Sequence, residues 1–132
     1  MKILKKKEII KIEATTRYLN TLMNAVEETR SGKLPPNKLK EFVEQMRKRI
    51  DEITEDFPSI SKDLEELKKV EGLDPVELME NGLDIYKKAF NILNLFLTDS
   101  KSEHLEEGLK TVKEAHEKFV TIQEFLSKVT GI

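Results

Sequence analysis

The chain contains no cysteine and no tryptophan, and its 132 residues include only five glycines, four prolines and two histidines. The absence of cysteine excludes disulfides, thiolate metal sites and a cysteine nucleophile. Neither sign of charge dominates, because 23 basic and 25 acidic residues leave a formal net charge of −2. This balance argues against the broadly basic surface of a nucleic-acid-binding domain.

Long apolar runs are missing as well. The longest mostly apolar stretch spans residues 89–97 and is interrupted by Asn91 and Asn94, whereas a membrane-spanning helix needs about 20 apolar residues. The lysine-rich start is typical of a signal-peptide n-region, but no apolar run of adequate length follows it. By default, we expect a cytoplasmic protein.

Motifs that carry chemistry are also absent. A di-iron bundle requires Glu-x-x-His pairs, but lysines, Lys101 and Lys113, lie three residues before His104 and His116. The two histidines lie 12 residues apart, which turns them about 120° from each other on a helix. There is no H-E-x-x-H motif and no glycine-rich phosphate loop. The sequence therefore predicts no catalytic, cofactor-binding or metal-binding residues, no cofactor, and a protein that is not an enzyme.

What is present is periodic. Charged residues make up 36% and apolar residues 38% of the chain, and the apolar ones recur every three or four positions, which is typical of amphipathic helices. Four long helices are expected, over about 5–30, 37–70, 75–97 and 100–129, with short polar turns between them. We predict an all-α fold in which residues 1–132 form one domain, an antiparallel up-down bundle.

The helix ends have recognisable capping residues. Gly32 is expected to end the first helix in a left-handed conformation. Asn37 is predicted as the N-cap of the second helix, and Asp74 with Pro75 as the start of the third. Ser100 and Glu103 have capping-box spacing for the fourth.

Pro58 lies inside the apolar stripe of the second helix, which keeps its phase across the proline. Two interpretations remain open: a single long helix kinked at Pro58, or a break with a new helix starting there. The second would bring the number of helices to five. The stripe consists of Leu39, Val43, Met46, Ile50, Ile53, Phe57, Ile60, Leu64 and Leu67.

The third helix has two apolar stripes, which predicts a central element covered on more than one side. Asn91 and Asn94 fall among its apolar residues and either face solvent between the stripes or fix the register of the core. The stripes are Val76, Met79, Leu83, Tyr86, Phe90, Leu93 and Leu97, and Leu78, Ile85, Ala89, Ile92 and Phe96.

A short pattern, E-x-G-L-x-x-x-K-x-A, occurs in both the third and the fourth helix at an offset of 26 residues. It contains Gly82 in the third helix and Gly108 in the fourth. A glycine inside a helix costs roughly 1 kcal/mol relative to alanine. We therefore expect a neighbouring helix to approach closely at both positions.

These features favour a non-enzymatic interaction protein, such as an adaptor, an assembly factor or a small regulatory factor. A continuous second helix of about 50 Å must overhang the bundle or bend over its end. An overhanging apolar stripe would favour a homodimer or a protein partner docked on an exposed helical face.

Two alternatives are kept open. One is a phosphotransfer or signalling bundle that uses His116, which requires an accessible imidazole. The other is an N-terminal helix whose Lys5, Lys6 and Lys7 bind anionic lipid or nucleic acid. Glu8 and Glu13 dilute that basic cluster, and no aromatic residue accompanies it, so the composition argues against membrane and nucleic-acid partners.

Overall fold

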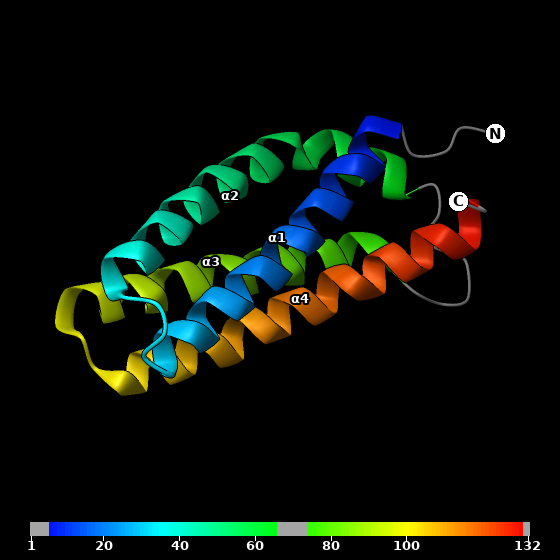
Figure 1. Cartoon of the computed structure of the whole chain (residues 1–132). Helices are drawn as coiled ribbons and strands as arrows, with labels where there is room; N and C mark the ends of the chain where they lie inside the picture. The colour runs from blue at the N-terminus through cyan, green and yellow to red at the C-terminus, as the bar shows by residue number, and fades with distance from the viewer. Residues whose placement is uncertain (1–5, 66–73, 131–132) are drawn as a thin grey trace.

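The computed structural model describes the backbone of residues 6–65 and 74–130, and the side chains of residues 9–65 and 74–128. These ranges contain four helices and no strand: α1 (Lys6–Arg30), α2 (Pro36–Glu65), α3 (Pro75–Asp99) and α4 (Ser102–Thr130). Each helix packs against the next in chain order, and α4 returns to pack against α1 (Figure 1). The predicted all-α, up-down bundle of four long helices is confirmed. No helix in the described ranges is long and apolar enough to cross a membrane.

The end of α1 is closed as the sequence predicted. Gly32 has a φ of +83°, a conformation that glycine adopts without a Cβ penalty. The amide of Lys33 donates to the carbonyl of Glu28 at 2.8 Å, and the amide of Gly32 donates to the carbonyl of Thr29 at 3.2 Å. These two bonds form a Schellman motif, which turns the chain toward α2.

The start of α3 also agrees with the sequence. Asp74 is the N-cap, and its carboxylate accepts hydrogen bonds from the amides of Val76 and Glu77 at 3.1 and 3.2 Å. Pro75 occupies the first helical position, where its missing N–H removes no helical bond.

Two predicted N-caps are wrong. The second helix begins at Pro36, so Asn37 lies inside the first turn. The amide of Lys38 donates to the carbonyl of Pro35 at 2.9 Å. Ser100 ends α3 instead of starting α4, because it adopts a left-handed conformation with φ 58° and its amide donates to the carbonyl of Phe96. Only one residue separates Ser100 from Ser102, the first residue of α4.

The second helix runs without interruption through Pro58, which confirms the single-helix interpretation and excludes a break there. Its stripe is buried on both sides of the proline, at Ile53 and at Ile60 and Leu64. The helix arches along its length and bends over the bundle (Figure 1). Of the two possibilities for this long helix, overhanging the bundle or bending over its end, the described residues show the bend up to Leu64. An overhanging stripe therefore gives no reason for a homodimer there. The predicted end at residue 70 lies outside the described residues.

The third helix is central, as its two stripes predicted. It packs against both α2 and α4, and the α3–α4 pair is the most extensive contact in the described bundle. Met79, Tyr86 and Leu93 are fully buried. Asn91 and Asn94 face solvent, which confirms the first of the two interpretations for these residues.

Gly82 and Gly108 both lie at the α3–α4 contact. A Cβ atom on Gly82 would lie 3.2 Å from Cε2 of Phe119, and a Cβ atom on Gly108 would lie 2.5 Å from Cδ2 of Leu93. The expected close approach is thus confirmed at both glycines. The second contact is too short for a side chain without movement of its neighbours.

Candidate interaction surfaces

An open surface groove of about 760 Å³ follows α4 where it lies beside α3 and the end of α1. Ile85, Leu109 and Thr111 supply its least polar part, and Leu109 and Thr111 are nearly buried. The rim carries charges of both signs, with Arg30 bound to Glu106 at 3.3 Å. We call this region the α3–α4 groove; its charged residues are Arg30, Lys88, Glu106, Glu107, Lys110, Lys113 and Glu114.

The apolar second stripe of α3 continues beside this groove. Leu78 and Ile85 remain half-buried, so no described helix covers them fully. Leu95 is 50% exposed, and it follows Lys88 by seven residues, which places both on one face of α3. Ile10 on α1 is equally exposed, at 50%. Among the described large apolar side chains, Leu95 and Ile10 are the two exposed ones.

A smaller hollow of about 400 Å³ lies between the start of α2 and the end of α3. Its polar lining residues are Asn37, Lys40, Asn94 and Thr98, and its apolar ones are Pro36 and Leu97. All four polar residues are exposed, so no buried polar group marks this hollow as a specific ligand site.

The contact between α1 and α2 has a different character from the rest of the bundle. Lys11 pairs with Asp56, the hydroxyl of Tyr18 donates to the carbonyl of Phe42, and the Arg49 guanidinium lies 5.3 Å from the centre of the Tyr18 ring. Burial raises the pKa of Tyr18 well above its ordinary value, although nearby Arg49 opposes this. We call these five residues the α1–α2 seam.

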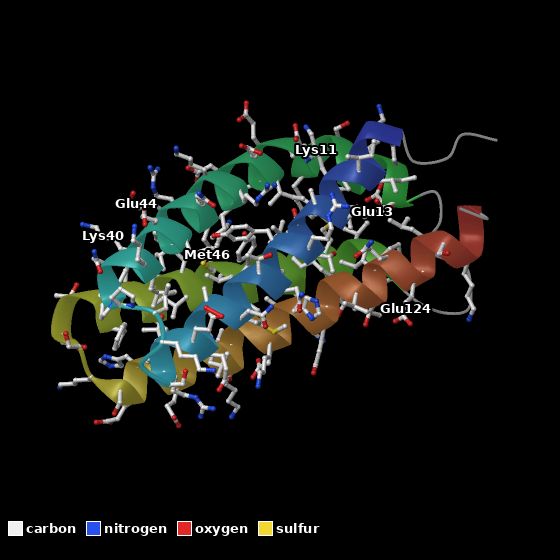
Figure 2. All side chains as sticks on the ribbon, in the orientation of Figure 1. Lys11, Glu13, Lys40, Glu44, Met46 and Glu124 are labelled. Atoms are coloured by element: carbon white, nitrogen blue, oxygen red, sulfur yellow. The ribbon has the colours of Figure 1, made fainter. Side chains whose placement is uncertain are left out.

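Figure 2 shows how labelled side chains of α2 divide between the interior of the bundle and solvent. Met46 points into the bundle, whereas Lys40 and Glu44 point away from it. Lys11 reaches from α1 toward α2, where Asp56 lies. The seam is therefore partly polar, and the apolar side chains of α2 pack beneath it.

The two histidines do not converge on a site. His104 is paired with Asp99, with 2.9 Å between Nδ1 and a carboxylate oxygen. A backbone hydrogen bond from Lys101 and, to a smaller extent, His104 hold the pKa of Asp99 below its usual range. His116 is half-buried on α4. Phosphotransfer requires an exposed imidazole and a buried one would exclude it, so this intermediate burial decides neither way.

The described residues give no support for a metal site, which the sequence did not predict, or for the basic N-terminal cluster, which it kept as an alternative. No group of three or more His, Asp or Glu side chains in the described ranges is arranged to hold a metal ion. Lys5 lies outside those ranges, and the side chains of Lys6 and Lys7 do too. Lys11, the next lysine along, is engaged with Asp56.

Sequence reasoning missed the seam and the Asp99–His104 pair. Tyr18 and Phe42 lie 24 residues apart and Lys11 and Asp56 lie 45 apart, so no local pattern connects them. For Asp99 and His104 a signal existed, because a carboxylate at a helix end and an imidazole five residues later are spaced to span a tight turn between helices.

The fold and the surface define an antiparallel four-helix bundle with a partly polar contact between its first two helices and an open groove beside its last two. In comparisons with protein-family models, curated proteins and solved structures, the chain matches none of them. Its function must therefore be argued from the bundle itself.

Proposed function

We propose that this chain is a non-enzymatic, cytoplasmic interaction protein, an adaptor, assembly factor or small regulatory factor, that binds another protein chain through the α3–α4 groove. The observation behind the proposal is that some apolar side chains of α3 are incompletely covered: Leu78 and Ile85 of its second stripe are half-buried, and Leu95, which belongs to neither stripe, is 50% exposed. Apolar side chains flanked by charged ones are typical of a protein-binding surface.

The mixed charge of the rim also favours a protein partner. Lys88, Lys110 and Lys113 lie close to Glu107 and Glu114 along the groove, so the rim is not a single-sign field of the kind that attracts nucleic acid or anionic lipid. A protein surface with interleaved charges suits such a rim, and this includes the surface of a second copy of the chain.

The test uses three matched substitutions. Ile85→Glu and Leu95→Glu place a charge on the proposed surface, and Ile10→Glu places the same charge on α1 at a site as exposed as Leu95. Sedimentation equilibrium measures self-association. A photo-crosslinking residue, at position 88 or at position 10, reports a discrete partner in native extract.

We expect either a concentration-dependent dimer or a discrete adduct formed from position 88, and we expect Ile85→Glu and Leu95→Glu to abolish it. Ile10→Glu should leave it intact. A strictly monomeric protein that forms no adduct from position 88 would overturn the proposal, and so would equal sensitivity to all three substitutions.

A further inference from the structure

The hydroxyl of Tyr86 is the clearest anomaly in the core. Tyr86 is fully buried on α3, and its ring packs edge-to-face on Phe119 with 6.3 Å between ring centres. Among the described residues, no protein group forms a hydrogen bond with this hydroxyl. Burying an unmatched hydroxyl is unfavourable, and a phenylalanine would fill the same space without it.

The charged groups that influence the pKa of Tyr86 show which helices lie near its hydroxyl. Burial raises the pKa of Tyr86, and the charges that influence it further come from Tyr18, Arg49 and Glu52. Tyr18 and Arg49 belong to the α1–α2 seam. The unmatched hydroxyl therefore lies within electrostatic reach of the seam, on the side of the core that α1 and α2 cover.

The contact between α1 and α2, which the seam residues bridge, is also the least extensive of the four contacts between adjacent helices in the described bundle. Its polar interactions include the Lys11–Asp56 pair, the bond from Tyr18 to Phe42, and the contact of Arg49 with the Tyr18 ring. Water can replace these polar interactions when the helices part. The apolar side chains that α2 places in the shared core, such as Met46 and Ile53, oppose the separation.

We propose that α2 is a displaceable cover: in the native state it separates from α1 at the seam, and water reaches the Tyr86 hydroxyl while α3 and α4 remain packed. The seam interactions and the apolar side chains that α2 buries against the core hold the cover closed, and solvation of Tyr86 favours the open form. This inference concerns the contact between α1 and α2, not the α3–α4 groove, and does not depend on the proposed function.

Two tyrosine-to-phenylalanine variants test the cover with opposite expected signs. Tyr86→Phe removes a hydroxyl that is unmatched in the closed form and solvated in the open form, so it favours closure. Tyr18→Phe removes a hydroxyl that is bonded in the closed form, so it favours opening. Each variant keeps its aromatic ring, and helical circular dichroism checks that each is folded.

Native-state hydrogen exchange of backbone amides, followed by mass spectrometry at increasing urea, provides the readout. In the unmodified chain, amides of α2 should exchange through an opening less dependent on urea than that of α3 and α4. Tyr86→Phe should slow exchange in α2 about fivefold or more, and Tyr18→Phe should accelerate it about fivefold, as expected for single hydroxyl interactions.

Three results would overturn the proposal. In the first, α2 and α4 exchange together at every urea concentration, which means that no partial opening exists. In the second, Tyr86→Phe slows exchange in α4 but not in α2, which means that the hydroxyl stays buried when α2 moves. In the third, both phenylalanine variants change exchange in α2 in the same direction.

Discussion

At the scale of single residues, Ser100 adopts a left-handed backbone conformation, which is unfavourable for a residue with a side chain. It has a φ of 58°, and a left-handed residue other than glycine costs roughly 1 kcal/mol or more. Ser100→Gly should therefore raise the free energy of unfolding by up to about 1 kcal/mol, once the greater freedom of glycine in the unfolded chain is included.

Thermal unfolding checks this prediction. An increase in stability of this size raises the midpoint by roughly 2–4 °C in a domain of this length. Ser102→Gly is the matched control, because Ser102 is the first residue of α4 and has no positive φ; it should lower the midpoint. A midpoint that falls in Ser100→Gly would show that the serine side chain stabilises the turn.

Asp99 gives a pH-dependent prediction at the same turn. Its pKa is lowered first by the hydrogen bond from the Lys101 amide, at 3.0 Å, and then by His104. A folded pKa below the unfolded value contributes stability at pH values above the ordinary range for a carboxyl group. That contribution is lost as the pH falls through the folded pKa.

Carboxyl titration by NMR should find the pKa of Asp99 below its usual range. His104→Ala should raise it only part of the way back, because the larger effect, from the Lys101 amide, remains. Full return to the ordinary value would mean that His104 is the dominant cause, and an unchanged pKa would mean that the imidazole does not act on Asp99 in solution.

At the scale of elements, the contact between α3 and α4 depends on two glycines that are not equivalent. A Cβ atom at position 108 would lie 2.5 Å from Cδ2 and 3.1 Å from Cγ of Leu93, which is fully buried and cannot move aside freely. Gly108→Ala should therefore lower the free energy of unfolding by about 1–3 kcal/mol, as overpacking of a core usually does.

Gly82→Ala is the matched comparison. Its Cβ atom would lie 3.2 Å from the Phe119 ring, and the gain of roughly 1 kcal/mol in helix propensity offsets the crowding. Urea unfolding should place Gly82→Ala close to the unmodified chain and Gly108→Ala well below it. The reverse order would mean that Leu93 repacks more easily than Phe119.

Pro58 gives the second prediction at this scale. Because α2 continues through it, Pro58→Ala would restore an N–H donor to the carbonyl of Thr54. The free energy of unfolding should rise by about 1–2 kcal/mol, less than the full cost of proline in a helix because α2 already arches to accommodate it. A neutral or destabilising result in urea would mean that the bend itself is needed for packing.

The elements also show how far the sequence could predict the fold. A stripe of constant phase across Pro58 kept a continuous helix among the two interpretations but could not exclude a break, whereas Gly82 and Gly108 were sufficient to predict a close helix contact. The sequence left open whether a second helix of this length overhangs the bundle or bends over its end, because a straight rise of 1.5 Å per residue does not show the arch that α2 adopts. The N-caps at Asn37 and Ser100 were wrong because a favourable residue type does not fix the backbone conformation at a particular position.

The candidate surfaces were less predictable than the fold. Apolar spacing shows which face of α3 is buried but not how completely its neighbours cover it, so the half-burial of Ile85 and the exposure of Leu95 required the assembled bundle. The same holds for Tyr86, whose stripe position predicted burial. Only the relative placement of α1 and α2 shows that its hydroxyl lacks a protein partner.

At the scale of the whole molecule, the internal echo has a structural explanation. Gly82 of α3 contacts Phe119 of α4, and Gly108 of α4 contacts Leu93 of α3. Gly108 lies 26 positions after Gly82, and Phe119 lies 26 positions after Leu93. The two antiparallel helices thus use one packing arrangement twice, related by an approximate two-fold axis. Both contacts lie at the α3–α4 interface, the most extensive contact in the described bundle, and this is the pair that the proposed opening of α2 leaves packed.

The charge distribution of the whole molecule predicts that its free energy of unfolding depends only weakly on salt. The described ion pairs are largely exposed; Arg47–Asp51 and Lys38–Glu41, for example, have side chains 58–66% and 59–64% exposed. Exposed pairs contribute about 0–1 kcal/mol each, and the nearly balanced charge of −2 creates little general repulsion for salt to screen. The free energy of unfolding in urea should therefore change by less than about 1 kcal/mol between low and molar sodium chloride.

Asp56→Asn separates the ion pair of the seam from the rest of the surface. It should lower the free energy of unfolding by up to about 1 kcal/mol at low salt, and the difference from the unmodified chain should vanish in molar salt, where the Lys11–Asp56 attraction is screened. Sodium sulfate should stabilise both proteins equally, because it strengthens apolar burial whatever the charges. A loss of several kcal/mol in sodium chloride would instead mean that the charged surface, and not the apolar core, holds the four helices together.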